Sequence, residues 1–363
     1  MIEQLAALSK RLARLATHND ITGQWPQSSL DALTEAGAWT WIIPTALGGQ
    51  KLEPVSQLLA YEAIAAGCMA TALILTQRDA ACELIAACSN ESLRNEYLPR
   101  LARHEIMTSV GISQLTTSRQ GGRPALAAEP QGDDFRLKGV MPWVTSAAHC
   151  DVFVAGAVLP DGRELLGLVP ADLAGVQIDA PMDLMALQAS HTAEVNCRNV
   201  ILPRSLVLRG PQERVLASRS PIKSLVVATC GVGLAGAMLE VIRESVGREG
   251  DSLTEGAEEI EARYEAVRER LFRFAETADR PDEEDHRSQI RIAVNDLLAR
   301  LAPAILVFAK GSSLLRQRDA QRLSREALFF MVWSAPREIR QGTLAALFDA
   351  PIDRLSARSV STD

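Results

Sequence analysis

Paired metal ligands are missing from this sequence. Its six cysteines include no C-x-x-C pair, and its five histidines include no H-x-x-x-H pair. Zinc sites use closely spaced cysteine and histidine ligands, so we expect no metal centre. Cysteines scattered in this way are expected to be reduced and buried, as they are in cytoplasmic proteins.

Basic charge and long apolar runs are also scarce. The 38 lysines and arginines are outnumbered by 45 acidic residues, which gives a formal net charge of -7. Nucleic acids and anionic membrane surfaces select basic clusters, so neither is an expected partner. The longest apolar run, residues 224–239, is shorter than the ~20 residues that span a bilayer. The N-terminal segment has the mixed charge of an amphipathic helix rather than the pattern of a secretory signal, so we predict a cytoplasmic location.

Two phosphate-binding motifs are absent as well. The chain contains neither G-x-G-x-x-G nor G-x-x-x-x-G-K-[ST]. Its predicted elements come as helices, then strands, then helices. That order excludes the alternating strands and helices of a Rossmann domain or a TIM barrel.

What is present predicts an α+β protein with three domains. Residues 1–108 are rich in helix formers. Residues 109–210 contain short β-prone runs separated by glycine, proline, asparagine and aspartate, and the segment "LPDGR" at 159–163 is a hairpin signal. They predict a small antiparallel barrel or sandwich. Residues 211–363 return to long amphipathic helices and predict a bundle.

Four segments in order carry a resemblance to the acyl-CoA dehydrogenase family of flavoproteins. They are "LDALTEAGAWTWIIPTALGG", "ESLRNEYLPRLARHE", "FRLKGVMPWVTSAAHCDVFVAGAV" and "LQASHTAEVNCRNVILP". The resemblance implies an N-terminal helical domain, a central β domain and a C-terminal four-helix bundle. It also implies FAD between the β domain and the bundle, a small-molecule substrate such as an acyl-CoA, and a homodimer or homotetramer.

One stretch of this resemblance supplies the flavin ring site. Trp143-Val144-Thr145 matches a W-[IV]-[TS] motif whose tryptophan packs beside the ring and whose hydroxyl reaches the ring edge near N5, and Ser146 follows it. A planar apolar ring suits an aromatic neighbour, and its polar edge suits hydroxyl and N–H groups. The alternative is an ordinary strand with a core tryptophan.

The family's second flavin segment, [ALV]-T-E-P-x-x-G-S-D, falls by spacing on residues 110–119. There Ser113 replaces the threonine, and the backbone of Val110 and Ile112 would contact the ring. Ser118 and Arg119 replace the usual Gly-Ser, and Arg119 is a candidate partner for a phosphate.

The family's adenosine-binding motif, Q-x-x-G-G-x-G-[YF], is largely lost. By spacing, Val307 replaces its glutamine and Lys310 replaces its first glycine. Only the second glycine is kept, as Gly311. FAD held in a different way and FMN are therefore both open.

The family's catalytic glutamate is replaced by Ser334 in the same register. That glutamate removes the substrate α-proton, and a hydroxyl without an adjacent base cannot do so at neutral pH. The base position that other members use, on the first bundle helix, holds Lys223-Ser224. Of the nearby carboxylates, Glu326 is expected to cap a helix or form a salt bridge in the bundle, and Glu338 lies about a turn past the site.

Two histidines complete the candidates. His191 is expected to be a hydrogen-bonding residue at a strand end, and His149, four residues after Thr145, is a weak catalytic candidate near the flavin. Three functions remain. The chain is a flavin-dependent oxidoreductase that does not perform standard α,β-dehydrogenation, a flavin-dependent monooxygenase, or a paralogue that has lost catalysis and serves as a binding or scaffolding subunit.

Overall fold

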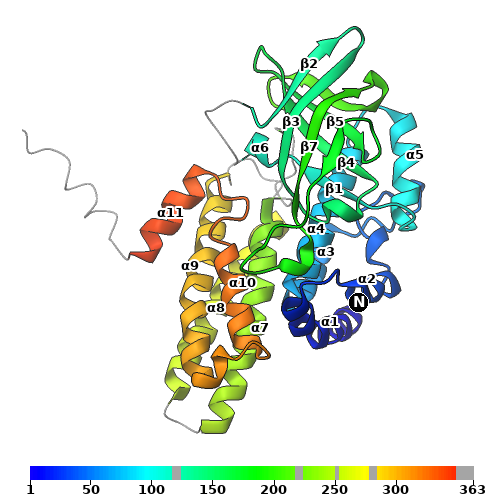
Figure 1. The fold of residues 1–363 in the computed structure, drawn as a ribbon. Helices are drawn as coiled ribbons and strands as arrows, with labels where there is room; N and C mark the ends of the chain where they lie inside the picture. The colour runs from blue at the N-terminus through cyan, green and yellow to red at the C-terminus, as the bar shows by residue number, and fades with distance from the viewer. Residues whose placement is uncertain (117–123, 217–223, 250–252, 278–283, 349–363) are drawn as a thin grey trace, which may run out of the picture. The chain divides into compact units, whose positions relative to one another are not determined.

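The computed structural model describes residues 1–116, 124–216, 224–249, 253–277 and 284–348 (Figure 1). The chain forms two compact units, Met1–Ser220 and Pro221–Asp363. The predicted α+β class is confirmed, with helices, then strands, then helices along the chain. The predicted domain boundaries at 108/109 and 210/211 stay predictions.

The first unit begins with helices that bury one apolar face each. In α1, Leu5, Leu8 and Leu12 recur at helical spacing and are buried. The helix ends at Gly23, whose φ of 61° gives the left-handed cap that glycine adopts without strain. The five long helices of this segment are α1 (Ile2–Thr22), α2 (Gln27–Glu35), α3 (Pro54–Gly67), α4 (Met69–Ala86) and α5 (Glu91–Ala102).

The same unit contains one 8-stranded sheet with the order β6-β7-β3-β2-β4-β5-β8, in which β1 also pairs with β4. Its strands are β1 (Thr108–Gly111), β2 (Leu126–Gln131), β3 (Asp134–Val144), β4 (Val152–Val158), β5 (Glu164–Pro170), β6 (Val176–Ile178), β7 (Ala193–Leu202) and β8 (Val207–Gln212). The predicted hairpin at 159–163 is confirmed, because it joins the antiparallel strands β4 and β5 through Gly162 at φ 85°.

The predicted antiparallel barrel or sandwich needs one correction, because two of its strand pairs are parallel. β1 and β2 both run parallel to β4, whereas β2–β3, β3–β7, β4–β5, β5–β8 and β6–β7 are antiparallel. Parallel pairing requires a long connection, and β1 reaches β4 only after the whole β2–β3 hairpin has intervened. Short hydrophobic runs alone do not reveal such pairings.

The second unit is helical and contains α7 (Val226–Glu249), α8 (Thr254–Thr277), α9 (Glu284–Ala309), α10 (Asp319–Phe329) and α11 (Arg337–Leu347). α7 and α9 pack closely, because a Cβ added at Gly231 would lie only 2.5 Å from Cγ1 of Val294. The helices within Val226–Gly247 and Arg287–Ala309 are long and apolar enough to cross a membrane. Core helices of bundles pass the same test, so this is weak evidence for a membrane, and the predicted absence of one stays a prediction.

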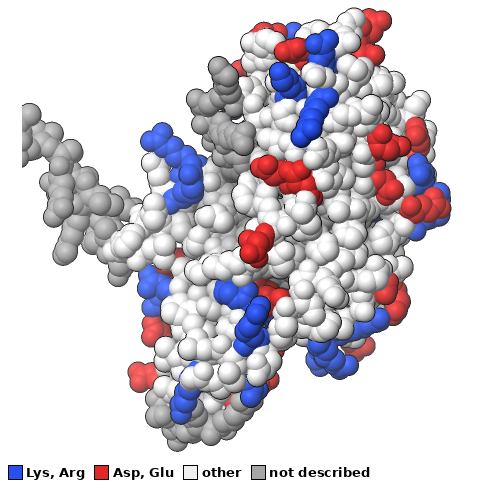
Figure 2. All heavy atoms as spheres, viewed as in Figure 1, with Lys and Arg blue, Asp and Glu red and all other residues white. Residues whose placement is uncertain are grey.

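Acidic and basic side chains both occur across the surface that Figure 2 shows. Many of the exposed arginines pair with a carboxylate on the same or a neighbouring helix, as Arg243 does with Glu240 and Glu261. Such exposed pairs each contribute little to stability.

Candidate functional site

The end of β1 and the short helix α6 (Ser113–Thr116) form the first part of the site. Val110 and Ile112 are buried there, and the ring contact predicted for their backbone stays a prediction. The Gln114 side chain fixes this turn by donating to the carbonyl oxygens of Gly111, at 2.9 Å, and Gly156. Gly156 of β4 leaves room for this packing, since a Cβ there would lie 2.5 Å from Cδ1 of Leu115.

The end of β3 forms the second part. Val144 is fully buried, whereas Trp143, which alternation turns to the other side of the strand, is 52% exposed. The two parts lie side by side, because a Cβ added at Gly111 would lie 2.3 Å from Sδ of Met141 on β3. The structure therefore brings together the two segments that sequence matching assigned to the flavin ring.

Three buried polar atoms in this region have no hydrogen-bond partner among the described residues: Oγ of Ser113, Oγ of Ser146 and Oε1 of Gln114. Buried polar groups are nearly always paired, so unpaired ones indicate a missing ligand or water. Together with the half-exposed indole of Trp143, they fit a planar group with a polar edge, such as the flavin ring. A bound flavin would supply the hydride-accepting chemistry that no side chain provides.

Two further hydroxyl groups, those of Ser190 and Thr192, lie close to Thr145. Ser146 has a φ of 62°, and its N–H donates to the carbonyl oxygen of Ser190 at 2.9 Å. Thr192 donates to Thr145 at 3.4 Å, and the hydroxyls of Ser190 and Thr192 are 2.9 Å apart. Sequence analysis assigned neither Ser190 nor Thr192 a role, although both lie in the fourth segment that resembles the family.

His149 and His191 form a hydrogen-bonded pair in the same place. Nε2 of His149 lies 3.0 Å from Nδ1 of His191, and Nε2 of His191 lies 3.1 Å from the carbonyl oxygen of Gly23. Because a carbonyl only accepts, His191 donates through Nε2, and His149 donates to its Nδ1. The role predicted for His191 as a hydrogen-bonding residue is confirmed.

The His149 ring also stacks on Trp25, with centroids 3.7 Å apart and planes 12° apart. Burial, and secondarily the neighbouring His191, lower the pKa of His149 below its ordinary value. The lowered pKa favours the neutral form of His149, in which Nδ1 is an acceptor. Its predicted place near a flavin stays a prediction.

Ser334 and Gly311 belong to the second unit and lie at opposite ends of α10. Gly311 opens the 3₁₀ turn η9 (Gly311–Leu314) before the helix, and Ser334 follows the turn after it. The 11 residues of α10 alone separate them by roughly 16 Å. Ser334 is exposed and has a left-handed backbone, with φ 44°. The structure does not bring these two predicted positions together.

The turn before Ser334 is held by Arg291, a residue that sequence analysis missed. Its Nη2 donates to the carbonyl oxygens of Phe330 at 2.8 Å and Trp333 at 2.9 Å, which satisfies the end of α10. Only 6% of Arg291 is exposed, and burial lowers its pKa to about 9. A charged residue inside the apolar run "SQIRIAV" was the available signal.

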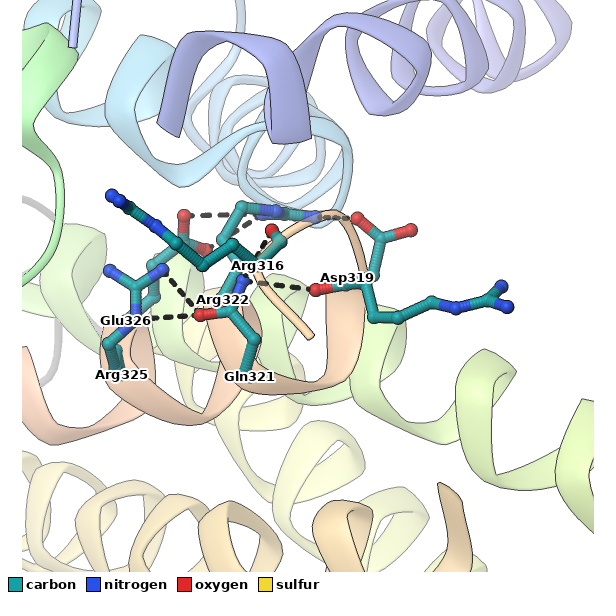
Figure 3. Close-up of polar contacts among 7 residues, drawn as sticks. Arg316, Asp319, Gln321, Arg322, Arg325 and Glu326 are labelled. Carbon is teal, nitrogen blue, oxygen red and sulfur yellow. Dashed lines mark hydrogen bonds and ion pairs between the residues drawn. The ribbon is translucent and has the colours of Figure 1, made fainter. Parts of the chain in front are cut away.

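Glu326 is buried and forms an ion pair with Arg322, which confirms the predicted salt bridge (Figure 3). Nη1 of Arg322 lies 3.0 Å from its Oε2, and Nη2 of Arg322 lies 2.9 Å from Oδ1 of Asp319. Glu326 is therefore committed to Arg322, and Glu338 is exposed in the first turn of α11. Three residues considered from sequence, Ser118, Arg119 and Lys223, lie outside the described residues.

Comparisons with known proteins agree with the fold. A family model for the N-terminal domain of acyl-CoA dehydrogenases matches residues 5–105. A probable acyl-CoA dehydrogenase of Bacillus subtilis (strain 168), YngJ, is 24% identical over 93% of this chain and 93% of its own.

Two solved structures share the fold at lower identity. A glutaryl-CoA dehydrogenase from Mycobacterium smegmatis in complex with FADH2 has a TM-score of 0.81 and 19% identity, covering 99% of this chain and 95% of its own. A dibenzothiophene monooxygenase from Paenibacillus sp. A11-2 has a TM-score of 0.78 and 16% identity, covering 96% and 97%.

The chain is therefore similar in sequence and in fold to the acyl-CoA dehydrogenase superfamily. Its relatives are acyl-CoA dehydrogenase-like flavoproteins, and they include a monooxygenase.

Proposed function

We propose that this chain is a flavin-dependent oxidoreductase that does not perform standard α,β-dehydrogenation. It binds FAD with the ring beside Trp143, Thr145 and Ser146, and FMN is the alternative cofactor. The unpaired buried oxygens of Ser113 and Ser146 beside the half-exposed indole carry this proposal. The test is whether the purified protein contains flavin or takes it up.

The reaction is proposed from what replaces the family's base. Ser334 has no carboxylate, and Glu326 is held by Arg322. The substrate is a small molecule, and an acyl thioester is the first class to test because the Bacillus subtilis relative is named for acyl-CoA chemistry. Abstraction of an α-proton from such a thioester needs a base that this register does not supply.

A monooxygenase is the second candidate, and a specific observation favours it. Oxygenation with reduced flavin depends more on a dry, hydrogen-bonding pocket than on a strong base. Thr145 and Ser146 are buried, and the neutral His149 follows them. The structural likeness to a dibenzothiophene monooxygenase supports the same class.

A paralogue without catalysis is the third candidate. It is supported by the loss of the adenosine motif around Gly311 and of the glutamate at Ser334. Flavin binding distinguishes it from the other two candidates, because a binding or scaffolding subunit of this kind needs no flavin.

Replacing Ser334 with glutamate is expected to add weak acyl-CoA dehydrogenation with little effect on folding. The side chain at position 334 is exposed, so a larger one has room. The left-handed backbone there has to be adopted by serine and by glutamate alike, so the substitution adds little strain. Anaerobic bleaching of bound flavin by a series of acyl-CoAs measures the result, with Ser334→Gln as the matched control. If flavin-loaded Ser334→Glu stays as inactive as Ser334→Gln, the register that places Ser334 at the base position is wrong.

We also propose a homodimer or homotetramer located in the cytoplasm. The second unit exposes several large apolar side chains, namely Val307, Leu314, Leu315, Leu328, Val332, Leu344, Leu347 and Phe348. Exposed apolar surface of this kind is typical of a protein interface. The six cysteines are buried and form no disulfide, which suits a reducing compartment. A monomeric mass from light scattering at micromolar concentration would contradict the oligomer.

A further inference from the structure

Four buried hydroxyl groups lie where two turns of the first unit meet. Thr145 and Ser146 follow β3, and Ser190 and Thr192 flank His191 before β7. Their exposed fractions are 5%, 1%, 0% and 6% in that order. The hydrogen bond from the Ser146 N–H to the Ser190 carbonyl oxygen joins the two turns, so the backbone fixes the positions of the hydroxyls.

The direction of the hydrogen bonds follows from proton counting. The Thr192 hydroxyl donates to Thr145 Oγ1, and the Ser190 and Thr192 hydroxyls lie 2.9 Å apart. A hydroxyl has one proton and two acceptor lone pairs. Because Thr192 uses its proton on Thr145, it accepts from Ser190. Thr145 then retains its own proton, and no hydrogen bond recorded among the described residues uses it.

We propose that Ser190 and Thr192 are positioning residues that turn the Thr145 hydroxyl into a fixed hydrogen-bond donor toward the flavin ring edge. This inference rests on the proposed function, because it requires a flavin beside Thr145. N5 of an oxidised flavin carries a lone pair and accepts a hydrogen bond, whereas N5 of the two-electron reduced flavin carries hydrogen and donates. A fixed donor at Thr145 therefore favours the oxidised flavin over the reduced one.

The test is the reduction midpoint of the flavin-loaded protein, titrated anaerobically with dithionite against a reference dye. Thr192→Val keeps the shape of the side chain and removes the donor, so Thr145 becomes free to turn and accept. We expect the preference for oxidised over reduced flavin to fall about three- to tenfold, the effect of one neutral hydrogen bond. A tenfold change raises the midpoint of a two-electron couple by about 30 mV. Thr192→Ser retains the donor and is expected to restore the wild-type midpoint.

Two further variants keep the outcome clear. Ser190→Ala removes the donor to Thr192 and is expected to raise the midpoint in the same direction by a smaller amount, which serves if Thr192→Val folds poorly. Thr76→Val is the control, because among the described residues this buried hydroxyl bonds only to the Leu73 carbonyl oxygen of its own helix. Its midpoint is expected to match the wild type.

The possible failures are distinguishable. An unchanged or lower midpoint in flavin-loaded Thr192→Val and Ser190→Ala overturns the positioning role and leaves the proposed function standing. A wild-type protein that takes up neither FAD nor FMN overturns both.

Discussion

Replacing Glu326 with alanine is expected to destabilise the C-terminal unit by about 3 kcal/mol. The Arg322 and Glu326 side chains are 4% and 3% exposed, and each would be costly to bury alone. Removing the carboxylate takes away the buried partner of the Arg322 guanidinium, whereas its second carboxylate partner, Asp319, is half exposed. The free energy of unfolding, measured by urea titration and circular dichroism, reports this loss.

The control variants separate a structural role from a general sensitivity of the bundle. Glu338→Ala, at an exposed carboxylate in α11, is expected to change the unfolding free energy by less than about 0.5 kcal/mol. The double variant Arg322→Met with Glu326→Leu is expected to recover most of the loss, because apolar residues often replace a buried ion pair without cost. Wild-type stability in Glu326→Ala would show that Glu326 is not committed to Arg322 and is available as a catalytic base.

Replacing Trp143 with alanine is expected to weaken FAD binding about tenfold or more while leaving the protein folded. Half of this side chain is already exposed, so its loss removes little from the core. An aromatic neighbour of a planar ring contributes both buried area and stacking, and tenfold corresponds to about 1.4 kcal/mol. Fluorescence titration of flavin-free protein with FAD gives the dissociation constant.

A matched pair of variants makes this prediction specific. Trp143→Phe is expected to keep FAD affinity within about threefold of the wild type, because an aromatic face remains. Lys138→Ala, at an exposed residue on the same strand, is expected to have no effect. Equal affinity in the wild type and Trp143→Ala would place the flavin ring elsewhere.

Local sequence signals predicted the fold well. Helical spacing of Leu5, Leu8 and Leu12 and the hairpin glycine at 162 each specify structure through neighbours in the chain. The Trp143–Ser146 segment could be recognised for the same reason, as a short contiguous motif. The parallel pairing of β1 with β4 could not, because it depends on segments 44 residues apart, such as Thr108 and Val152.

The polar contacts around the site were beyond reach of local patterns for a related reason. His191 bonds to a carbonyl 168 residues earlier, at Gly23, and Thr192 reaches Thr145 across 47 residues. Arg291 donates to the carbonyl oxygen of Phe330, which lies 39 residues later in the chain, just after α10. A single residue type carries no information about such partners, so only the folded chain reveals which hydroxyls and charges are paired and which are left unpaired.

The visible absorbance of the purified protein, with mass identification of any released flavin, tests the central proposal most directly. We predict a yellow protein that contains FAD or takes it up in a molar amount equal to that of the chain. Its colour is expected not to bleach when acyl-CoAs are added without oxygen. A colourless protein that takes up neither FAD nor FMN would contradict the flavin-dependent function. Rapid bleaching by an acyl-CoA would contradict the loss of standard dehydrogenation inferred from Ser334.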